Sequence, residues 1–235
     1  MDAPLDLDSD RRGLAGATAR RDGAAVVALL SGRDPGLLLQ HAGTGLLVAL
    51  TQQAEGATGL VAGLVAALTE RDWCGDDELA GHLSAAAGGP PTGRVLVPAD
   101  LDMVADLLEG DLAYGFGGHL DRTTGEAWPE AAFEDGAADE DLDLDDDQRW
   151  LRVPNLGSRD GWRDMHAFAT GMVTEPDLTE RLLDAIEGRG AFSRFRRVMD
   201  GHPGQLPSWH AFRDERRAGR ARDWLAGTGY DASPP

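Results

Sequence analysis

Apolar residues recur at helical spacing along the first third of the chain. Between residues 57 and 70 they fall at i, i+1, i+4, i+5 and i+8, which predicts a helix with one apolar stripe. The stripe consists of Leu60, Val61, Leu64, Val65 and Leu68. Upstream, Asp34 followed by Pro35 is typical of a helix N-cap and first turn, so we expect another helix to open there. The sequence therefore predicts a small helical bundle over residues 11–88.

A glycine- and proline-rich run separates this bundle from the rest of the chain. Residues 89–93 read GPPTG, a composition that cannot continue a helix or fill a core, so we predict a linker there. A second domain is expected over residues 94–230. It should open with a short strand at residues 94–98 and an amphipathic helix at residues 100–109.

The pattern then changes to one typical of short strands. Residues 114–120 and 126–128 flank a turn that contains Gly125, which predicts a β-hairpin, and residues 150–154 form another candidate strand. Residues 134–147 contain nine acids and no base. Charges of one sign at this density repel each other, so we predict a disordered acidic loop over residues 134–147.

From residue 158 onward the helical spacing returns. Asp177 and Glu180 resemble a capping box at the start of one helix, and Phe192 and Phe195 belong to the apolar stripe of the next. A last helix begins near Trp209. The expected fold class is therefore α+β and mostly helical, with an N-terminal helical bundle and a domain that combines a short antiparallel sheet with C-terminal helices.

The composition bears on the expected compartment and partners of the protein. The net charge of −19 argues against a general attraction to nucleic acid or to anionic lipid. All 22 basic residues are arginines, which fits a codon bias and is not in itself a sign of phosphate recognition. The single cysteine, Cys74, fits a reducing compartment and is expected to be at least half-buried. The start of the chain lacks a basic and apolar leader, so we expect a cytoplasmic protein without a membrane partner.

Several segments of the second half resemble one family. They are HLDRTTGE at residues 119–126, RVP at 152–154, RDMHAF at 163–168, LLDAIEGRGAFSRF at 182–195 and WHAFRDER at 209–216. With these segments, roughly residues 94–230 resemble the uncharacterised protein family 0158, a set of bacterial proteins of unknown function. The resemblance implies kinship and carries over no catalytic residue, because the family has no established activity.

The residues that could carry catalysis do not form a recognisable constellation. His119 and Asp121 lie two residues apart, so on a strand they would share a face, as two ligands of a metal ion could. A hydrogen-bonded hairpin end is the alternative interpretation of the same pair. No nucleophile, base and orienting group can be assembled, and no cofactor is expected.

Arginines and aromatic residues are concentrated near the carboxyl end. Residues 189–222 contain nine arginines and three acids, with four aromatic rings interleaved between 192 and 212. The candidate interaction surface consists of Arg189, Arg194, Arg196, Arg197, Arg213 and Arg216. Arginines suit phosphates and exposed rings can stack on bases. Alternatively, the rings are core anchors beneath a solvated face of arginines.

Three functional hypotheses remain open on these patterns. The first is a non-enzymatic protein-binding or adaptor module, with another protein as its partner. The second is nucleic-acid association through the arginine–aromatic helices, gated by the acidic loop. The third is a metal-dependent hydrolase centred on His119 and Asp121.

Overall fold

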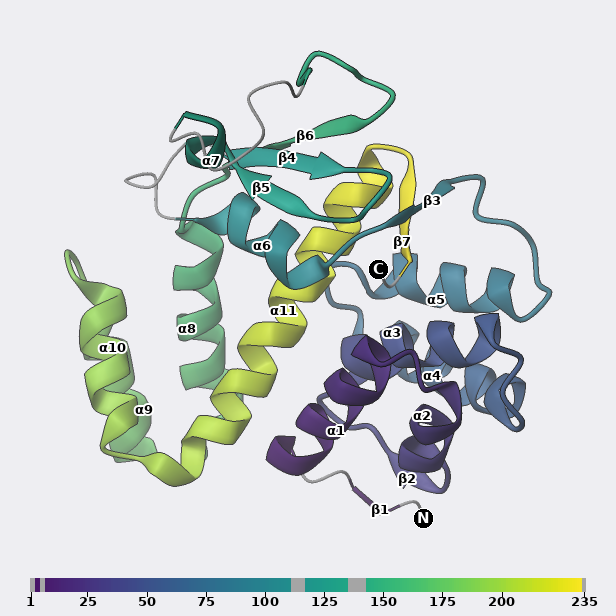
Figure 1. Cartoon of the computed structure of the whole chain (residues 1–235). Helices are drawn as coiled ribbons and strands as arrows, with labels where there is room; N and C mark the ends of the chain where they lie inside the picture. The colour runs from purple at the N-terminus through teal and green to yellow at the C-terminus, as the bar shows by residue number, and fades with distance from the viewer. Residues whose placement is uncertain (1–2, 5–6, 111–116, 135–142, 234–235) are drawn as a thin grey trace.

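The computed structural model describes residues 3–4, 7–110, 117–134 and 143–233. Within these ranges the fold is α+β and mostly helical, as the sequence predicts. The N-terminal part forms a bundle (Figure 1), which confirms the expected helices. Its elements are β1 (Ala3–Pro4), α1 (Leu7–Ala19), α2 (Gly23–Leu30), β2 (Arg33–Asp34), α3 (Leu39–Thr51), α4 (Ala57–Arg71) and α5 (Asp76–Ala86). β1 and β2 pair in parallel.

The bundle is held together by one apolar cluster built around α3. The predicted stripe of α4 contributes Val61, Leu64 and Leu68, which are buried against the other helices of the bundle. α3 is apolar on most of its surface because it contacts α1, α2, α4 and α5. Each fully buried leucine of this kind stabilises the fold by about 1.5–3 kcal/mol relative to an exposed one.

A second layer begins after the glycine–proline run. β3 (Val95–Pro98) is followed by α6 (Leu101–Glu109), and the side chain of Asp100 caps α6 by accepting the backbone N–H of residues 102 and 103. The strand predicted at residues 94–98 is therefore present. Its partner is β7 (Tyr230–Ser233), which lies beside it in parallel although about 135 residues separate the two strands in the chain.

The predicted hairpin supplies two strands of a three-stranded antiparallel sheet, in which β4 is central. β4 (Gly117–Asp121) pairs with β5 (Ala127–Pro129) on one side and with β6 (Trp150–Pro154) on the other. α7 (Glu130–Glu134) follows β5 directly. Leu120 of β4 is fully buried in a cluster with α6, so this face of the sheet is covered by a helix. Of the predicted disordered acidic loop at residues 134–147, positions 135–142 lie outside the described residues. The prediction is wrong for the others, because residue 134 ends α7 and the backbone N–H groups of Asp145 and Asp146 donate to Asp143 in a turn.

The carboxyl-terminal helices form the third part of the fold. They are α8 (Arg159–Gly171), α9 (Pro176–Ala185), α10 (Ala191–Asp200) and α11 (Leu206–Gly227), with a 3-10 turn, η2 (Pro203–Gln205), before the last one. Their shared core contains Phe168, Leu182, Phe195 and Phe212. In the part of the chain that the structure describes, no helix is both long and apolar enough to cross a membrane.

The long helix α11 connects all three parts. In Figure 1 it runs diagonally between the bundle on one side and α8 on the other, with α6 across its carboxyl half. Ala211 is buried in the core of the bundle, Phe212 in the core of the C-terminal helices, and Leu225 in the core beneath the sheet. The helix thus belongs to three apolar clusters at once.

α11 and the loop before α5 approach each other at a pair of glycines. A Cβ atom added to Gly219 would lie 2.1 Å from the carbonyl oxygen of Cys74, and one added to Gly75 would lie 2.1 Å from that of Gly219. Gly75 also has a positive φ of 82°, a conformation that residues with a side chain rarely adopt. Glycine is therefore required at both positions for this contact.

Three local predictions are wrong. The helix expected at Asp34 begins at Leu39, since Asp34 pairs with β1 and its carboxylate accepts the N–H of Gly36. Asp177 does not cap α9: the N-cap is Glu175, and a proline occupies the first helical position. Cys74 is exposed, not half-buried or buried.

Candidate functional site

A groove of about 460 Å³ lies where α6, α8, α10 and α11 meet. Its floor and walls come from segments that are far apart in the sequence. The apolar lining residues are Met165, Phe192, Phe195, Met199, Leu206 and Trp209, and the ionisable ones are Asp106, Glu109, Asp164, Arg196, Asp200, His210, Arg213 and Arg217. A cavity of this size and mixed lining can accept several side chains of a bound molecule.

The aromatic rings near the carboxyl end point mainly inward. Phe195 and Phe212 are buried, and Trp209 is partly buried with its ring centroid 4.8 Å from that of Phe195. Phe192 differs, because 44% of it is exposed where it lies against Gly161 at the start of α8. The spacing of Phe195 and Met199 on α10 places them in the core, whereas Phe192 lies at the edge of the groove.

The structure divides the six predicted surface arginines into two groups. Arg194 bonds to the carbonyl oxygens of Ala185, Glu187 and Arg189, so it caps the carboxyl end of α9. Arg216 binds the buried carboxylate of Asp164 at 3.0 Å. Both guanidinium groups therefore hold the fold together.

The other four predicted arginines lie closer to solvent. Arg189, Arg196 and Arg197 are exposed, and they make no side-chain hydrogen bond or ion pair within the described ranges. Arg213 is partly buried and binds Asp214, its neighbour in the chain, at 2.8 Å. Arg196 and Arg213 line the groove, but Arg189 and Arg197 do not belong to its lining.

Acids from other elements neutralise the arginines of α11. Arg220 binds Glu109 of α6 at 2.5 Å and Asp164 of α8 at 2.7 Å, and Arg217 binds Asp106. Within the described lining of the groove, three arginines face four carboxylates. Burial also lowers the pKa of His210, so this imidazole is neutral near pH 7. The excess of arginines in the linear sequence thus does not produce a cationic surface in the groove.

His119 and Asp121 lie on β4, as the sequence predicts, and are engaged in different contacts. The carboxylate of Asp121 accepts the backbone N–H of Thr123 at 2.8 Å and binds Arg149 at 2.8 Å. Although burial opposes it, these bonds lower the pKa of Asp121. His119 packs edge-on against Phe133, and burial lowers its pKa. Among the described residues, no group of three or more His, Cys, Asp or Glu side chains is placed to hold a metal ion.

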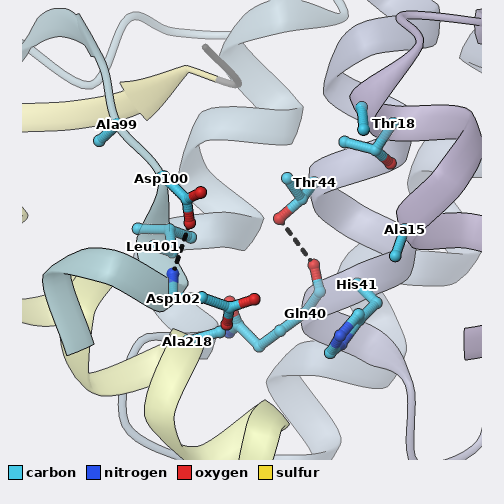
Figure 2. A pocket seen from close by; sticks show the side chains of 11 residues that line it. Ala15, Thr18, Gln40, His41, Thr44, Ala99, Asp100, Leu101, Asp102 and Ala218 are labelled. Atoms are coloured by element: carbon cyan, nitrogen blue, oxygen red, sulfur yellow. Dashed lines mark hydrogen bonds between the residues drawn. The ribbon is translucent and has the colours of Figure 1, made fainter. Parts of the chain in front are cut away.

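A second cavity, of about 420 Å³, lies between the bundle and α6. Figure 2 shows its two walls: Ala15, Thr18, His41 and Thr44 come from α1 and α3, and residues 99–102 come from the start of α6 and the segment before it. Gln40 and Ala218 lie at its base, where α3 meets α11. Sequence reasoning did not predict this site, because its polar residues are spread over three helices, α1, α3 and α6, and the residue that caps α6.

A buried charge network beneath this cavity joins α3 to α11. Glu215 is fully buried, and its carboxylate accepts the backbone N–H of Gln40 at 2.6 Å and that of His41 at 3.0 Å. It also binds the His41 Nδ1 atom at 2.7 Å and the Arg71 guanidinium at 2.9 Å. A carboxylate at the amino end of a helix interacts favourably with the helix dipole, so Glu215 acts as a tertiary cap of α3.

Two further residues complete the network. Asp76 forms a two-pronged pair with Arg71, at 2.7 and 2.8 Å, and also accepts an N–H of the Gln40 amide at 2.9 Å. Arg222 donates to the Gln40 amide oxygen at 3.1 Å and to the Thr44 hydroxyl at 2.9 Å. Burial lowers the pKa of Arg222 to about 10. Gln40 thus has every polar group of its side chain occupied.

The network sets the ionisation of His41. Burial by itself would lower the pKa of His41, but the hydrogen bond and the charge of Glu215 outweigh this effect and raise it. The Nδ1 atom faces Glu215, and Nε2 makes no hydrogen bond with any described residue. On the opposite wall, burial and the nearby charge of Asp100 raise the pKa of Asp102, while the His41 charge opposes the shift. The cavity therefore holds an imidazole, whose protonated form Glu215 favours, and two carboxyl groups on the opposite wall.

Comparisons with known proteins identify one part of the chain. No curated protein and no solved structure matches it. Residues 120–232 match the model of the uncharacterised protein family UPF0158. This range starts about 26 residues later than the resemblance expected from residue 94, so β3, α6 and most of β4 precede it. The segment from residue 120 to residue 232, which includes α8 to α11 and the whole predicted arginine surface, is thus the part of the chain that is similar to the uncharacterised protein family UPF0158.

Proposed function

We propose that this chain is a non-enzymatic protein-binding or adaptor module, and that the groove between α6, α8, α10 and α11 is its binding surface. The ligand is a short amphipathic segment of another protein. Its apolar side chains pack against Phe192 and Trp209, and its charged side chains of both signs pair with the rim. We further propose that the protein acts in a bacterial cytoplasm, which fits its single cysteine and its acidic composition.

The balance of charges in the groove carries this proposal. Three arginines and four carboxylates surround an apolar floor, so the groove offers partners to both basic and acidic side chains. An amphipathic peptide segment presents this combination of apolar and charged groups. A polyanion such as RNA would bring its phosphates next to the carboxylates of Asp106 and Asp200, where like charges repel.

Phe192 is the residue expected to anchor the partner. It is an aromatic side chain at the edge of the groove and is 44% exposed, although the other rings of the region are buried or partly buried. Aromatic side chains that become fully buried on association carry a large share of the binding energy at protein interfaces. A partner that covers Phe192 would remove this apolar area from water.

A peptide library displayed on phage tests the proposal. The intact wild-type chain is the immobilised target, and an excess of the soluble variant Phe192→Ser removes phage that bind elsewhere. We expect enriched peptides in which apolar residues recur at regular spacing between charged ones. Fluorescence polarisation should then show that Phe192→Ser weakens the best peptide by about tenfold or more, which corresponds to about 1.4 kcal/mol.

Leu96→Ser provides the matched control. Leu96 is also apolar and exposed, at 60%, but lies on β3 and does not line the groove. It should leave the dissociation constant of the peptide unchanged. Equal weakening by both variants, or no enrichment at all, would reject the proposal. Tight binding of a 20-nucleotide single-stranded RNA that weakens steeply with salt would favour the nucleic-acid hypothesis instead.

A further inference from the structure

The cavity between α1, α3, α6 and α11 has features of a site for a small molecule, separate from the groove. It encloses about 420 Å³ and combines apolar walls with a few polar groups, as small-molecule sites do. Alanines supply much of the wall, namely Ala15, Ala19, Ala99 and Ala218. Short side chains on facing elements leave the space open.

Some of the polar groups that line the cavity already make hydrogen bonds within the protein. The Thr44 hydroxyl donates to the Gln40 carbonyl at 2.8 Å and accepts from Arg222, and the Gln40 side chain bonds to Asp76 and Arg222. These residues are therefore fixed in place and unavailable to a ligand.

The remaining polar groups face each other across the cavity. Within the described residues, His41 Nε2 and the Asp102 carboxylate make no hydrogen bond to protein, and one carboxylate oxygen of Asp100 holds the amino end of α6. Figure 2 shows His41 on the α3 wall, and Asp100 and Asp102 on the α6 wall. His41 is held in its position through Glu215, so its Nε2 atom is preorganised for a hydrogen bond to a ligand.

The charges of these groups define the complementary ligand. Two carboxyl groups and one imidazole line the cavity, and the imidazole is already paired with the Glu215 carboxylate, so negative charge is in excess. A cation near Asp100 and Asp102 would relieve the repulsion between them, and a hydroxyl group would form a hydrogen bond with His41 Nε2. The alanine walls suit a short aliphatic chain that connects the two groups.

We propose that this cavity binds a small aliphatic amine that carries a hydroxyl group, with its ammonium group on Asp102 and its oxygen on His41. The site lies between the bundle and α6, so a bound amine would link these two parts of the fold.

Three probes of similar length test the proposal on the full chain. They are 4-amino-1-butanol, its uncharged counterpart 1,5-pentanediol, and the anion 5-hydroxypentanoate. Thermal unfolding and isothermal titration calorimetry at low salt should show binding of the amine, at least tenfold weaker binding of the diol, and no binding of the anion. Equal effects of all three probes, or no effect of the amine, would overturn the proposal.

Two variants and one control locate the binding. Asp102→Asn removes the exposed carboxylate and should weaken the amine at least tenfold, and Ala15→Met should abolish binding by filling the cavity. Asp177→Asn removes an exposed carboxylate of α9 and should have no effect. Circular dichroism verifies that each variant is folded. Amine binding that survives both cavity substitutions would place it elsewhere on the molecule and contradict the assignment.

Discussion

Replacing Glu215 with alanine should test the role of α11 as the connecting helix. The carboxylate is fully buried and accepts four hydrogen bonds, from the backbone N–H of Gln40, from the backbone and ring of His41, and from Arg71. Glu215→Ala removes the acceptor and leaves these donors inside the protein. One of them is the Arg71 guanidinium, and another is the His41 ring, whose pKa is raised by Glu215.

The expected cost follows from the burial of this group. Removing one partner of a buried ion pair typically destabilises a protein by about 3–5 kcal/mol, because the other charge stays buried without compensation. For a chain of this length, the loss corresponds to a drop in melting temperature of about 10 °C. Urea unfolding, followed by tryptophan fluorescence and by circular dichroism, measures the change in the free energy of unfolding.

A control variant and a second readout make the test specific. Asp223→Ala removes an exposed carboxylate from the same helix and should change the free energy of unfolding by less than about 0.5 kcal/mol. An NMR titration of Glu215→Gln should give a lower pKa for His41 than in the wild type, because the charge of Glu215 is gone. A cost below about 1 kcal/mol for Glu215→Ala, or an unchanged pKa of His41, would refute the reasoning.

Three further predictions concern stability. The folded-state pKa of His41 is raised, so its ion pair with Glu215 should stabilise the fold fully below about pH 6.5 and progressively less as pH rises through the folded pKa. Urea denaturation across this pH range should show the loss of stability. The variant His41→Gln should depend less on pH over the same range. Gly219→Ala should lower the melting temperature by several degrees, because its Cβ would meet a carbonyl oxygen at 2.1 Å. The control Gly227→Ala has open space around it in the described structure and should be neutral or stabilise the protein by up to about 1 kcal/mol. Equal effects of the two substitutions would contradict the close contact at Gly219. Asp164→Ala should cost about 3–5 kcal/mol in urea unfolding, because this buried carboxylate holds two arginines of α11, and a cost within 0.5 kcal/mol would show that these pairs contribute little.

The helices were predictable because their signal is local. The apolar stripe of α4 and that of α10 are present in a few turns of sequence, and Val61, Leu64, Leu68, Phe195 and Met199 are buried as expected. Phe192 of the α10 stripe is the exception, because it is 44% exposed. The hairpin of β4 and β5 was predictable for the same reason, since the turn and both strands lie within a dozen residues. Neighbouring residues thus predicted that these elements exist, whereas they did not give the correct helix start near Asp34 or the correct cap at Asp177.

Contacts between distant segments could not be predicted in this way. No local pattern indicates that β3 pairs with β7, or that Glu215 caps a helix 175 residues away. The number of arginines in residues 189–222 also does not give the charge of the folded surface, because acids of α6 and α8 pair with arginines of α11. The charge of one segment can be counted from the sequence, whereas the charge of a surface depends on all the segments that form it.

The proposal that the groove binds another protein can be tested most directly by photo-crosslinking in cells of the native host. A photoreactive phenylalanine analogue, p-benzoylphenylalanine, replaces Phe192 at the groove in one strain and Leu96 on β3 in another. Illumination should produce a discrete, nuclease-resistant adduct with another protein from position 192 and none from position 96. A nuclease-sensitive adduct at position 192, or the same adducts from both positions, would contradict the account.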